Sequence, residues 1–470
     1  MNLTLAEAGI GAGAVLEAPE SWANAGSLLV RGYGIDAGAV GPGELFFAVA
    51  GGEADGHDRV AAALARGAIG AVVARARVAS LPDAALAAPL LVAEDPRGAL
   101  QLLAAHVRRR WGRRLVAVAG SAGKTVAVEA TAAALGAKFA VLDPQGRSSA
   151  GLGVALQLLR LEPHHEFAVV KMGMSRAGEI AALARMAAPD WGVVTNVGTA
   201  QIGSFAEGRA GIARGLFELV AALPAKGVAF LNCDDAYVSQ FGRNFLGKAI
   251  YFGAGPCADP QIVEAQEDEN GLRLHYRYGD TTGSFAVRLP GLHNASNVCA
   301  ALAVALEAGV ELEAAVTALS ALTAAEGHGR TLAMGGATIL DESAGSNPET
   351  LRSMIHTLAS RPGRRRILVA GEIAGLGEQG PALHAASGKA AAEAGLDLVL
   401  GVKGDAEHLA SAACAGGVAA IFLRSAEAAG EWLVNHIEPG DVVLVKGSPG
   451  AGLGQVIEAL RAPISTSERL

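Results

Sequence analysis

Aromatic side chains are scarce in this sequence, which limits the classes of protein that it can belong to. Phe, Trp and Tyr make up 4% of the 470 residues, whereas hydrophobic residues make up 51%. Because Ala supplies much of that share, the composition suits a globular protein of thin helices packed on sheets. A chain of this length exceeds what one hydrophobic core usually serves, so we expect several domains, with three as the working number.

Cysteines are few and lack a recognisable spacing. Cys233, Cys257, Cys299 and Cys414 form no CxxC pair and have no His-rich surroundings. We therefore expect neither a disulfide framework nor a zinc site, and a reducing cytoplasm fits best.

Long runs of basic or apolar residues are also missing. The net charge is -8 and the densest basic cluster covers only residues 108–114, which argues against a nucleic-acid partner. No uncharged apolar run approaches the ~20 residues that span a bilayer, and residues 1–13 lack the pattern of a signal peptide. We expect a cytoplasmic protein without a membrane partner.

Short apolar runs alternate with Ala/Leu-rich helical stretches along most of the chain. Four runs in the middle predict buried strands of a parallel sheet, at 115–119, 167–170, 192–194 and 228–231. A polar turn within 271–290 predicts an antiparallel hairpin appended to that sheet.

A second α/β run follows Arg330 and predicts a Rossmann-like domain. Its candidate strands lie at 367–370, 396–400, 419–422 and 442–445. The first ~95 residues hold mixed short strands and a helix at 60–66. The predicted domains are therefore 1–95, 96–328 and 329–470.

A phosphate-binding loop is the strongest single motif. The predicted strand at 115–119 runs into Gly120-Ser121-Ala122-Gly123-Lys124-Thr125, and a helical stretch follows. Glycines let backbone N–H groups wrap a phosphate, the helix N-terminus adds its positive end, Lys meets the β- and γ-phosphates and Thr offers a hydroxyl to Mg²⁺. An ordinary glycine-rich turn is the alternative, disfavoured because strand, loop, Lys-Thr pair and helix coincide.

The loop is a short form, because Val118 stands where the general motif has its first Gly. This version resembles the loop of Mur ligases and folylpolyglutamate synthetases. Further motifs occur in matching order at 43–49, 55–58, 172–180, 195–198, 232–235, 291–297, 341–348 and 446–448. Taken together, they resemble the D-alanyl-D-alanine-adding branch of the Mur ligase family over nearly the whole chain.

The resemblance implies an α/β fold of three domains: an N-terminal substrate-handle domain, a central P-loop parallel sheet and a C-terminal Rossmann-like domain that closes over ATP. Members use ATP and Mg²⁺ to turn a carboxylate into an acyl phosphate, which an amine attacks to form an amide. The expected partners are therefore small-molecule carboxylate and amine substrates.

The same resemblance assigns residues to roles. Those expected to act in catalysis are Lys124, Lys171 and Arg330. Those expected to bind ATP are Gly120, Ser121, Gly123, Lys124, Thr125, His293, Asn294, Asn297, Arg330 and Asp341. Those expected to bind the substrates are Asp55, Gly56, His57, Asn347 and Pro348, and Thr125 is the expected metal ligand. Taken alone, the His293-Asn294 pair would more often be a helix cap.

The sequence departs from the family at its metal-binding positions. Lys171 replaces a metal-binding Glu, Gln201 a metal-binding His, and Leu216 a carbamylated Lys. We expect one Mg²⁺ ion rather than two, with the Lys171 ammonium supplying charge to a phosphate. Drift in a site no longer used for catalysis is the alternative.

Substrate motifs are eroded as well, at 36–38, 149–150, 344–345 and 450. We therefore expect an amide-forming ligase with a specialised, non-peptidoglycan substrate. The rival hypothesis is an inactive, ATP-binding or structural partner of an active Mur-like protein. An unrelated P-loop kinase or NTPase is a weaker rival, disfavoured by the N- and C-terminal motifs.

Overall fold

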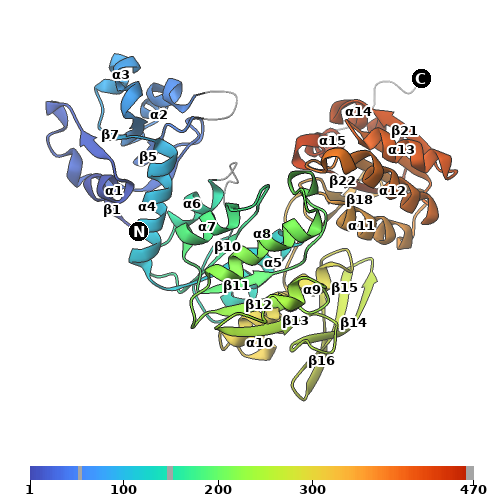
Figure 1. Cartoon of the computed structure of the whole chain (residues 1–470). Coiled ribbons are helices and arrows are strands. Elements are labelled where there is room, and N and C mark those ends of the chain that lie inside the picture. The colour runs from blue at the N-terminus through green and yellow to red at the C-terminus, as the bar shows by residue number, and fades with distance from the viewer. Residues whose placement is uncertain (51–54, 145–151, 462–470) are drawn as a thin grey trace. The chain divides into compact units, whose positions relative to one another are not determined.

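The computed structural model describes residues 1–50, 55–144 and 152–461 (Figure 1). The chain forms two compact units. The first comprises Met1–Ala117, Phe139–Val170 and Ala181–Asp190, and the second Val118–Lys138, Lys171–Ile180 and Trp191–Leu470. The predicted boundaries near 95 and 328 remain predictions, and the eroded motif at 149–150 lies outside the described residues. In the described part of the chain, no helix combines the length and the apolar character needed to cross a bilayer.

The N-terminal residues form a five-stranded sheet in the order β2-β7-β6-β5-β4. Its strands are β2 (Val15–Glu17), β7 (Leu90–Ala93), β6 (Gly70–Ala74), β5 (Glu44–Phe47) and β4 (Gly32–Gly34). The expected helix at 60–66 is confirmed as α2 (Val60–Ala65). The longer helix α4 (Pro96–Trp111) begins where Asp95 accepts hydrogen bonds from the N–H groups of Arg97 and Gly98, which satisfies free donors of its first turn.

A six-stranded sheet occupies the middle of the chain, in the order β13-β12-β11-β8-β10-β9. All four predicted strands are confirmed to within a residue or two at each end. The strands are β8 (Arg114–Ala119), β9 (Val141–Leu142), β10 (Phe167–Lys171), β11 (Trp191–Val194), β12 (Val228–Asn232) and β13 (Lys248–Phe252). Pairing of β11 with β12 and of β12 with β13 is parallel, and β11 and β12 are buried throughout, as apolar runs of a covered parallel sheet should be.

The predicted hairpin at 271–290 is confirmed, but it belongs to a sheet of its own. Strand β15 (Gly271–Tyr278) pairs antiparallel with β16 (Thr281–Val287), and β14 (Gln261–Asp268) pairs with the other edge of β15. These three strands form a separate sheet (yellow in Figure 1), so the expectation that the hairpin extends the central sheet was wrong. The alternating polar pattern gives each strand one exposed face, which does not suit a sheet covered on both faces.

The C-terminal sheet has the order β17-β18-β22-β19-β20-β21. The four predicted strands are confirmed as β19 (Arg366–Gly371), β20 (Leu398–Val402), β21 (Ala419–Leu423) and β22 (Val442–Lys446). Helix α11 (Pro348–Ser360) precedes these strands, and the helices between and after them are α12 (Gly380–Glu393), α13 (Ala406–Ala415), α14 (Ala426–His436) and α15 (Gly454–Arg461).

One C-terminal hairpin was not predicted from the sequence. Strands β17 (Arg330–Met334) and β18 (Ala337–Glu342) pair antiparallel around Gly335 and Gly336, which both have positive φ. A Gly-Gly pair between two apolar runs is a hairpin signal that could have revealed them.

The cysteines also differ from expectation. Cys233, directly after β12, forms a disulfide with Cys257, whereas Cys299 is buried and Cys414 exposed, both as free thiols. The expectation of no disulfide framework was therefore wrong for the Cys233–Cys257 pair. The paired residues are 24 positions apart, and only the folding of the parallel strands β12 and β13 brings their ends together.

Candidate functional site

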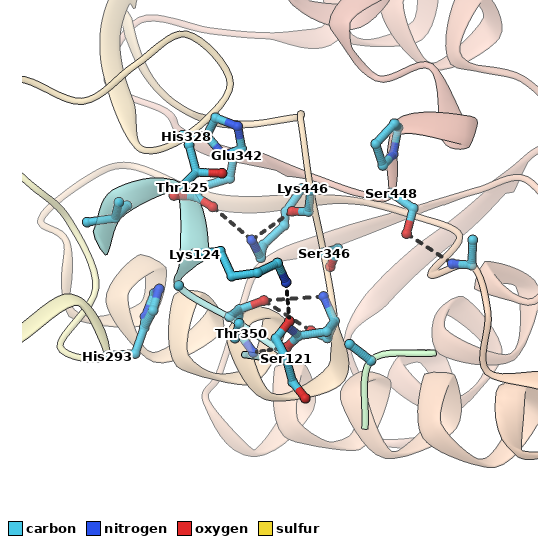
Figure 2. A pocket seen from close by; sticks show the side chains of 18 of the residues that line it. Ser121, Lys124, Thr125, His293, His328, Glu342, Ser346, Thr350, Lys446 and Ser448 are labelled. Atoms are coloured by element: carbon cyan, nitrogen blue, oxygen red, sulfur yellow. Dashed lines mark hydrogen bonds and ion pairs between the residues drawn. The ribbon is translucent and has the colours of Figure 1, made fainter. Parts of the chain in front are cut away.

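A cavity of about 320 Å³ lies within the second unit (Figure 2). Its lining comes from the phosphate loop and first turn of α5 (Lys124–Gly136), the end of β10, the segment before α9 (Asn294–Glu307) and several C-terminal segments. Of the residues predicted for catalysis or binding, those that line it are Ser121, Gly123, Lys124, Thr125, Lys171, His293, Asn294 and Asn347. The structure therefore gathers residues from well-separated motifs around one cavity.

The phosphate loop owes its curvature to two glycines. Gly120 and Gly123 both have positive φ, at 148° and 77°. A Cβ atom at Gly120 would collide with the Thr195 hydroxyl, and one at Gly123 with the Asn297 side chain. Only glycine fits both positions, and the turn that results leads into the N-terminus of α5, whose first residues line the cavity and offer free backbone N–H groups to an anion.

Lys124 is held by the loop it belongs to. Its Nζ donates hydrogen bonds to the carbonyl oxygens of Gly120 at 2.7 Å and Ser121 at 3.3 Å. Burial, together with the nearby charge of Lys171, lowers the pKa of Lys124 to about 8. The ammonium is thus positioned and partly desolvated before any ligand arrives, which strengthens its attraction for an anion.

Lys171 ends β10 and is exposed at the cavity. Its Nζ donates a hydrogen bond to Thr125 Oγ1 at 3.3 Å. The two side chains predicted to meet Mg²⁺ and phosphate therefore contact each other.

The His293, Asn294 and Asn297 side chains form a network at the start of α9. His293 Nδ1 hydrogen bonds with Ser353 Oγ at 2.9 Å, and burial lowers the pKa of His293 to about 4, so its ring is neutral. Asn294 donates to the Pro290 carbonyl at 2.7 Å and accepts from Asn297 Nδ2 at 2.9 Å. His293, at the N-cap position, makes no side-chain capping bond. His293 and Asn294 line the cavity, whereas Asn297 supports the loop from below Gly123.

The predicted C-terminal residues divide into those at the cavity and those away from it. Asn347 lines the cavity and caps α11 by accepting from Thr350 N at 2.8 Å, with Pro348 as the first residue of that helix. Asp341 is buried away from the lining and accepts from Ser343 Oγ at 2.6 Å. Arg330 pairs with Asp341 across β17 and β18, but its exposed side chain is not part of the lining. The ATP-binding roles of Arg330 and Asp341 remain predictions.

An ion pair on the C-terminal side of the cavity was not assigned a role from sequence. Lys446, the last residue of β22, donates to Glu342 Oε2 at 2.8 Å and to the Gly345 carbonyl at 3.0 Å, and both charged side chains are buried. Lys446 and Glu342 both line the cavity (Figure 2). Lys446 belongs to the motif noted at 446–448, and its charge at the carboxyl end of a buried parallel strand is the signal that could have given it a role.

The cavity carries net positive charge and unpaired hydroxyls. Among its described lining residues, three lysines, Lys124, Lys171 and Lys446, face one carboxylate, Glu342, which gives a formal charge of +2. In the described part of the chain, Ser121 Oγ and Ser346 Oγ are buried without a hydrogen-bond partner, and both residues line the cavity. Such groups fit an anionic ligand that brings several acceptor oxygens.

The residues that depart from the family's metal-binding pattern differ in whether they line the cavity. Lys171 and Gln201 line the cavity, and Gln201 has a positive φ of 63°. Leu216 is 1% exposed within α8 (Arg209–Ala222) and packs into the core, outside the lining. Among the described residues, no group of three His, Cys, Asp or Glu side chains is placed to hold a metal ion.

The predicted N-terminal substrate residues lie in the first unit and hold one another in place. Asp55 accepts from His57 N at 3.0 Å and contacts His57 Nδ1 at 2.7 Å, while His57 Nε2 accepts from Ala74 N at 2.9 Å. Arg77 donates to the second Asp55 oxygen at 2.8 Å, and a side chain at Gly56 would collide with the backbone of Val49. Their substrate-binding role remains a prediction.

Comparisons with known families match three consecutive parts of the chain. Residues 29–108 match the Mur ligase family catalytic domain, residues 118–305 the Mur ligase middle domain, and residues 328–449 the Mur ligase glutamate ligase domain.

Individual proteins are similar over most of their length. A UDP-N-acetylmuramoyl-tripeptide–D-alanyl-D-alanine ligase of Synechocystis is 35% identical over 427 residues, covering 90% of each chain. The enzyme of that name from Escherichia coli is 32% identical, covering 89% of this chain and 91% of its own. The crystal structure of MurF from Acinetobacter baumannii has a TM-score of 0.83 at 25% identity, covering 98% of this chain and 99% of its own.

Proposed function

We propose, because the chain belongs to the Mur ligase family of ATP-dependent ligases, that it uses ATP to join a carboxylate to an amine through an acyl phosphate. The observation that carries the proposal is the cavity in which the phosphate loop meets Lys171 and Lys446. Its net positive charge and its orphaned hydroxyls suit the triphosphate of ATP.

The chemistry requires two anions to approach each other. A carboxylate oxygen of the substrate forms a bond to the γ-phosphorus as the bond to the ADP oxygen breaks. The amine nitrogen then attacks the carbonyl carbon, and phosphate leaves as the nitrogen loses its proton to a base or water. Lysine ammoniums fixed beforehand offset the repulsion in the first step and stabilise the leaving oxygens. This role is supported by the positions of Lys124 and Lys171 beside the loop and of Lys446 on the C-terminal side.

The residues fit ATP better than they fit two protein-bound Mg²⁺ ions. Mg²⁺ is usually held through one or two carboxylates together with substrate phosphates. Among the described lining residues the acidic side chain is Glu342, which already pairs with Lys446. Any Mg²⁺ that accompanies ATP would be held chiefly by phosphate oxygens and water, with Thr125 as the predicted protein ligand.

The substrate is proposed to lie outside peptidoglycan synthesis. The similar proteins are named for a UDP-N-acetylmuramoyl tripeptide and D-alanyl-D-alanine. In this chain Asp36 accepts from the Gly38 N–H at 2.9 Å and Ala37 is buried, so the segment is a tight turn with two residues that offer no side-chain hydrogen bonds. Such a turn has little with which to recognise a sugar nucleotide.

An inactive partner of an active Mur-like protein is the second candidate. It is favoured by Leu216, whose apolar side chain is packed into the core where the family resemblance places a functional lysine. On this hypothesis the chain has no ligase activity. It is an ATP-binding or purely structural subunit that supports an active partner.

A phosphate-release screen separates the two. Purified protein is incubated with ATP and pairs of carboxylates and amines, with the Lys124→Ala variant as the control. Release of phosphate that needs both substrates and is lost in the variant supports the ligase. If no pair releases phosphate and the protein co-purifies with a second Mur-like chain, the partner hypothesis replaces it.

A further inference from the structure

We propose that the Lys171 ammonium takes the place of a protein-bound Mg²⁺ at the Thr125 hydroxyl, so that the cavity binds a nucleoside triphosphate without a metal held by the protein. The inference rests on the proposed function, since it concerns how the same cavity holds ATP. From the sequence, Lys171 is expected to replace the second Mg²⁺ ion of the family. In the structure Lys171 instead contacts Thr125, the predicted ligand of the first ion, so the inference changes which ion the ammonium replaces.

The contact between Lys171 and Thr125 is the first observation. An ammonium has three donors and no acceptor, so at 3.3 Å the Thr125 oxygen accepts and its lone pair points at a cation. Mg²⁺ requires oxygen ligands at about 2.0–2.1 Å in near-octahedral geometry. A Mg²⁺ ion bonded to the Thr125 oxygen would lie close to the Lys171 ammonium, and the two positive charges would repel each other. This geometry therefore favours either the ammonium or the metal ion at that oxygen, rather than both.

The second observation is that the cavity has no free carboxylate among its described lining residues to bind a metal ion. Glu342 is committed to Lys446, and the described residues provide no cluster of three metal-binding side chains. Glu129 lies four residues beyond Thr125 on α5, where the nearby Lys171 charge favours its ionised form, but it is not part of the lining. Burial raises the pKa of Glu129, which disfavours the charged form that a metal would need.

The arrangement of cations is the third observation. Lys124 and Lys171 both line the cavity, and Lys171 donates to the hydroxyl of Thr125, the residue that follows Lys124. Like charges brought together on one side of a cavity are costly unless an anion joins them. A triphosphate supplies that anion and can accept hydrogen bonds from both ammoniums, with Lys171 as a flexible point charge at the γ-phosphate.

The test measures ATP affinity by titration calorimetry in excess EDTA and in millimolar Mg²⁺. For the wild type we expect the two dissociation constants to agree within about threefold. Lys171→Met should weaken binding in EDTA by about tenfold or more, as expected for loss of a charge-assisted contact. Lys226→Met, which removes an exposed lysine outside the cavity, is the matched control and should bind as the wild type does.

A second variant tests the exchange of cations in the opposite direction. Lys171→Glu places a carboxylate beside the Thr125 hydroxyl, so its ATP affinity should become at least tenfold stronger in Mg²⁺ than in EDTA. Because Lys171 is exposed, both variants should keep the wild-type circular dichroism spectrum and melting temperature, which is checked first.

The outcomes distinguish this inference from the proposed function. Wild-type binding that depends strongly on Mg²⁺, or Lys171→Met binding that equals wild type in EDTA, would overturn the role of Lys171 while leaving the ATP site intact. Failure of the wild type to bind ATP in either buffer would overturn the proposed function itself.

Discussion

Raising the pH should weaken ATP binding through the titration of Lys124. Burial and Lys171 lower the pKa of Lys124 to about 8 in the free protein, and phosphate oxygens beside the ammonium would raise it again in the complex. ATP binding therefore takes up a proton wherever the free protein has lost one. The affinity is full below the lower pKa and falls as the pH rises through it.

The magnitude follows from the fraction of Lys124 that is protonated. With a pKa of about 8, roughly three quarters of the side chain is charged at pH 7.5 and about a tenth at pH 9. The dissociation constant for ATP should therefore rise about eightfold over this interval, which is roughly 1.3 kcal/mol of binding free energy. Starting at pH 7.5 keeps the nucleotide phosphates ionised throughout, since their last pKa lies near 6.

Titration calorimetry at fixed ionic strength, in buffers of different ionisation enthalpy, measures both the affinity and the proton uptake. Lys124→Ala is the control, because it should bind at least tenfold more weakly at pH 7.5 and lose the steep dependence between pH 7.5 and 9. A wild-type affinity that is flat across this interval, with no proton uptake, would refute the assignment of Lys124 as the phosphate-binding ammonium.

Three further predictions concern the cavity and its supports. Lys446→Met should destabilise the protein by about 3–5 kcal/mol in urea denaturation, because Glu342 is left as an unpaired buried charge, and the double variant with Glu342→Gln should recover much of the loss. Gly123→Ala should abolish measurable ATP binding in calorimetry, since the new methyl group collides with Asn297 and the backbone is strained at positive φ; unchanged binding would contradict the loop geometry. UDP-muramoyl-tripeptide should give little or no phosphate release with D-alanyl-D-alanine. Turnover comparable with that of the peptidoglycan enzymes would contradict the proposal of a substrate outside peptidoglycan synthesis.

The buried strands and the phosphate loop could be predicted because they depend on local patterns. An apolar run such as that of β12 has one stable environment, and the Gly-Lys-Thr loop is fixed by neighbours in sequence. The hairpin of β17 and β18 was missed although its Gly-Gly turn is a local signal, because its edge strand β17 is mostly exposed.

The contacts that could not be predicted join distant parts of the chain. Cys233 and Cys257 meet only after β12 and β13 have paired. The hydrogen bond between Lys171 and Thr125 depends on where the end of β10 and the first turn of α5 fall in the fold, which residue types alone do not specify. The resemblance to a family identified Lys171 as a departure, but only the structure shows which atom it contacts.

The close approach of Gly123 and Asn297 has a consequence for biosynthesis. The phosphate loop leaves the ribosome long before α9 does, yet Asn297 is the side chain against which Gly123 of the loop packs. A nascent chain that has completed only the loop and its flanking strand would lack this support, since long-range contacts form only when both partners have been made. The nucleotide site is therefore expected to mature late in translation, after the α9 segment has emerged and docked.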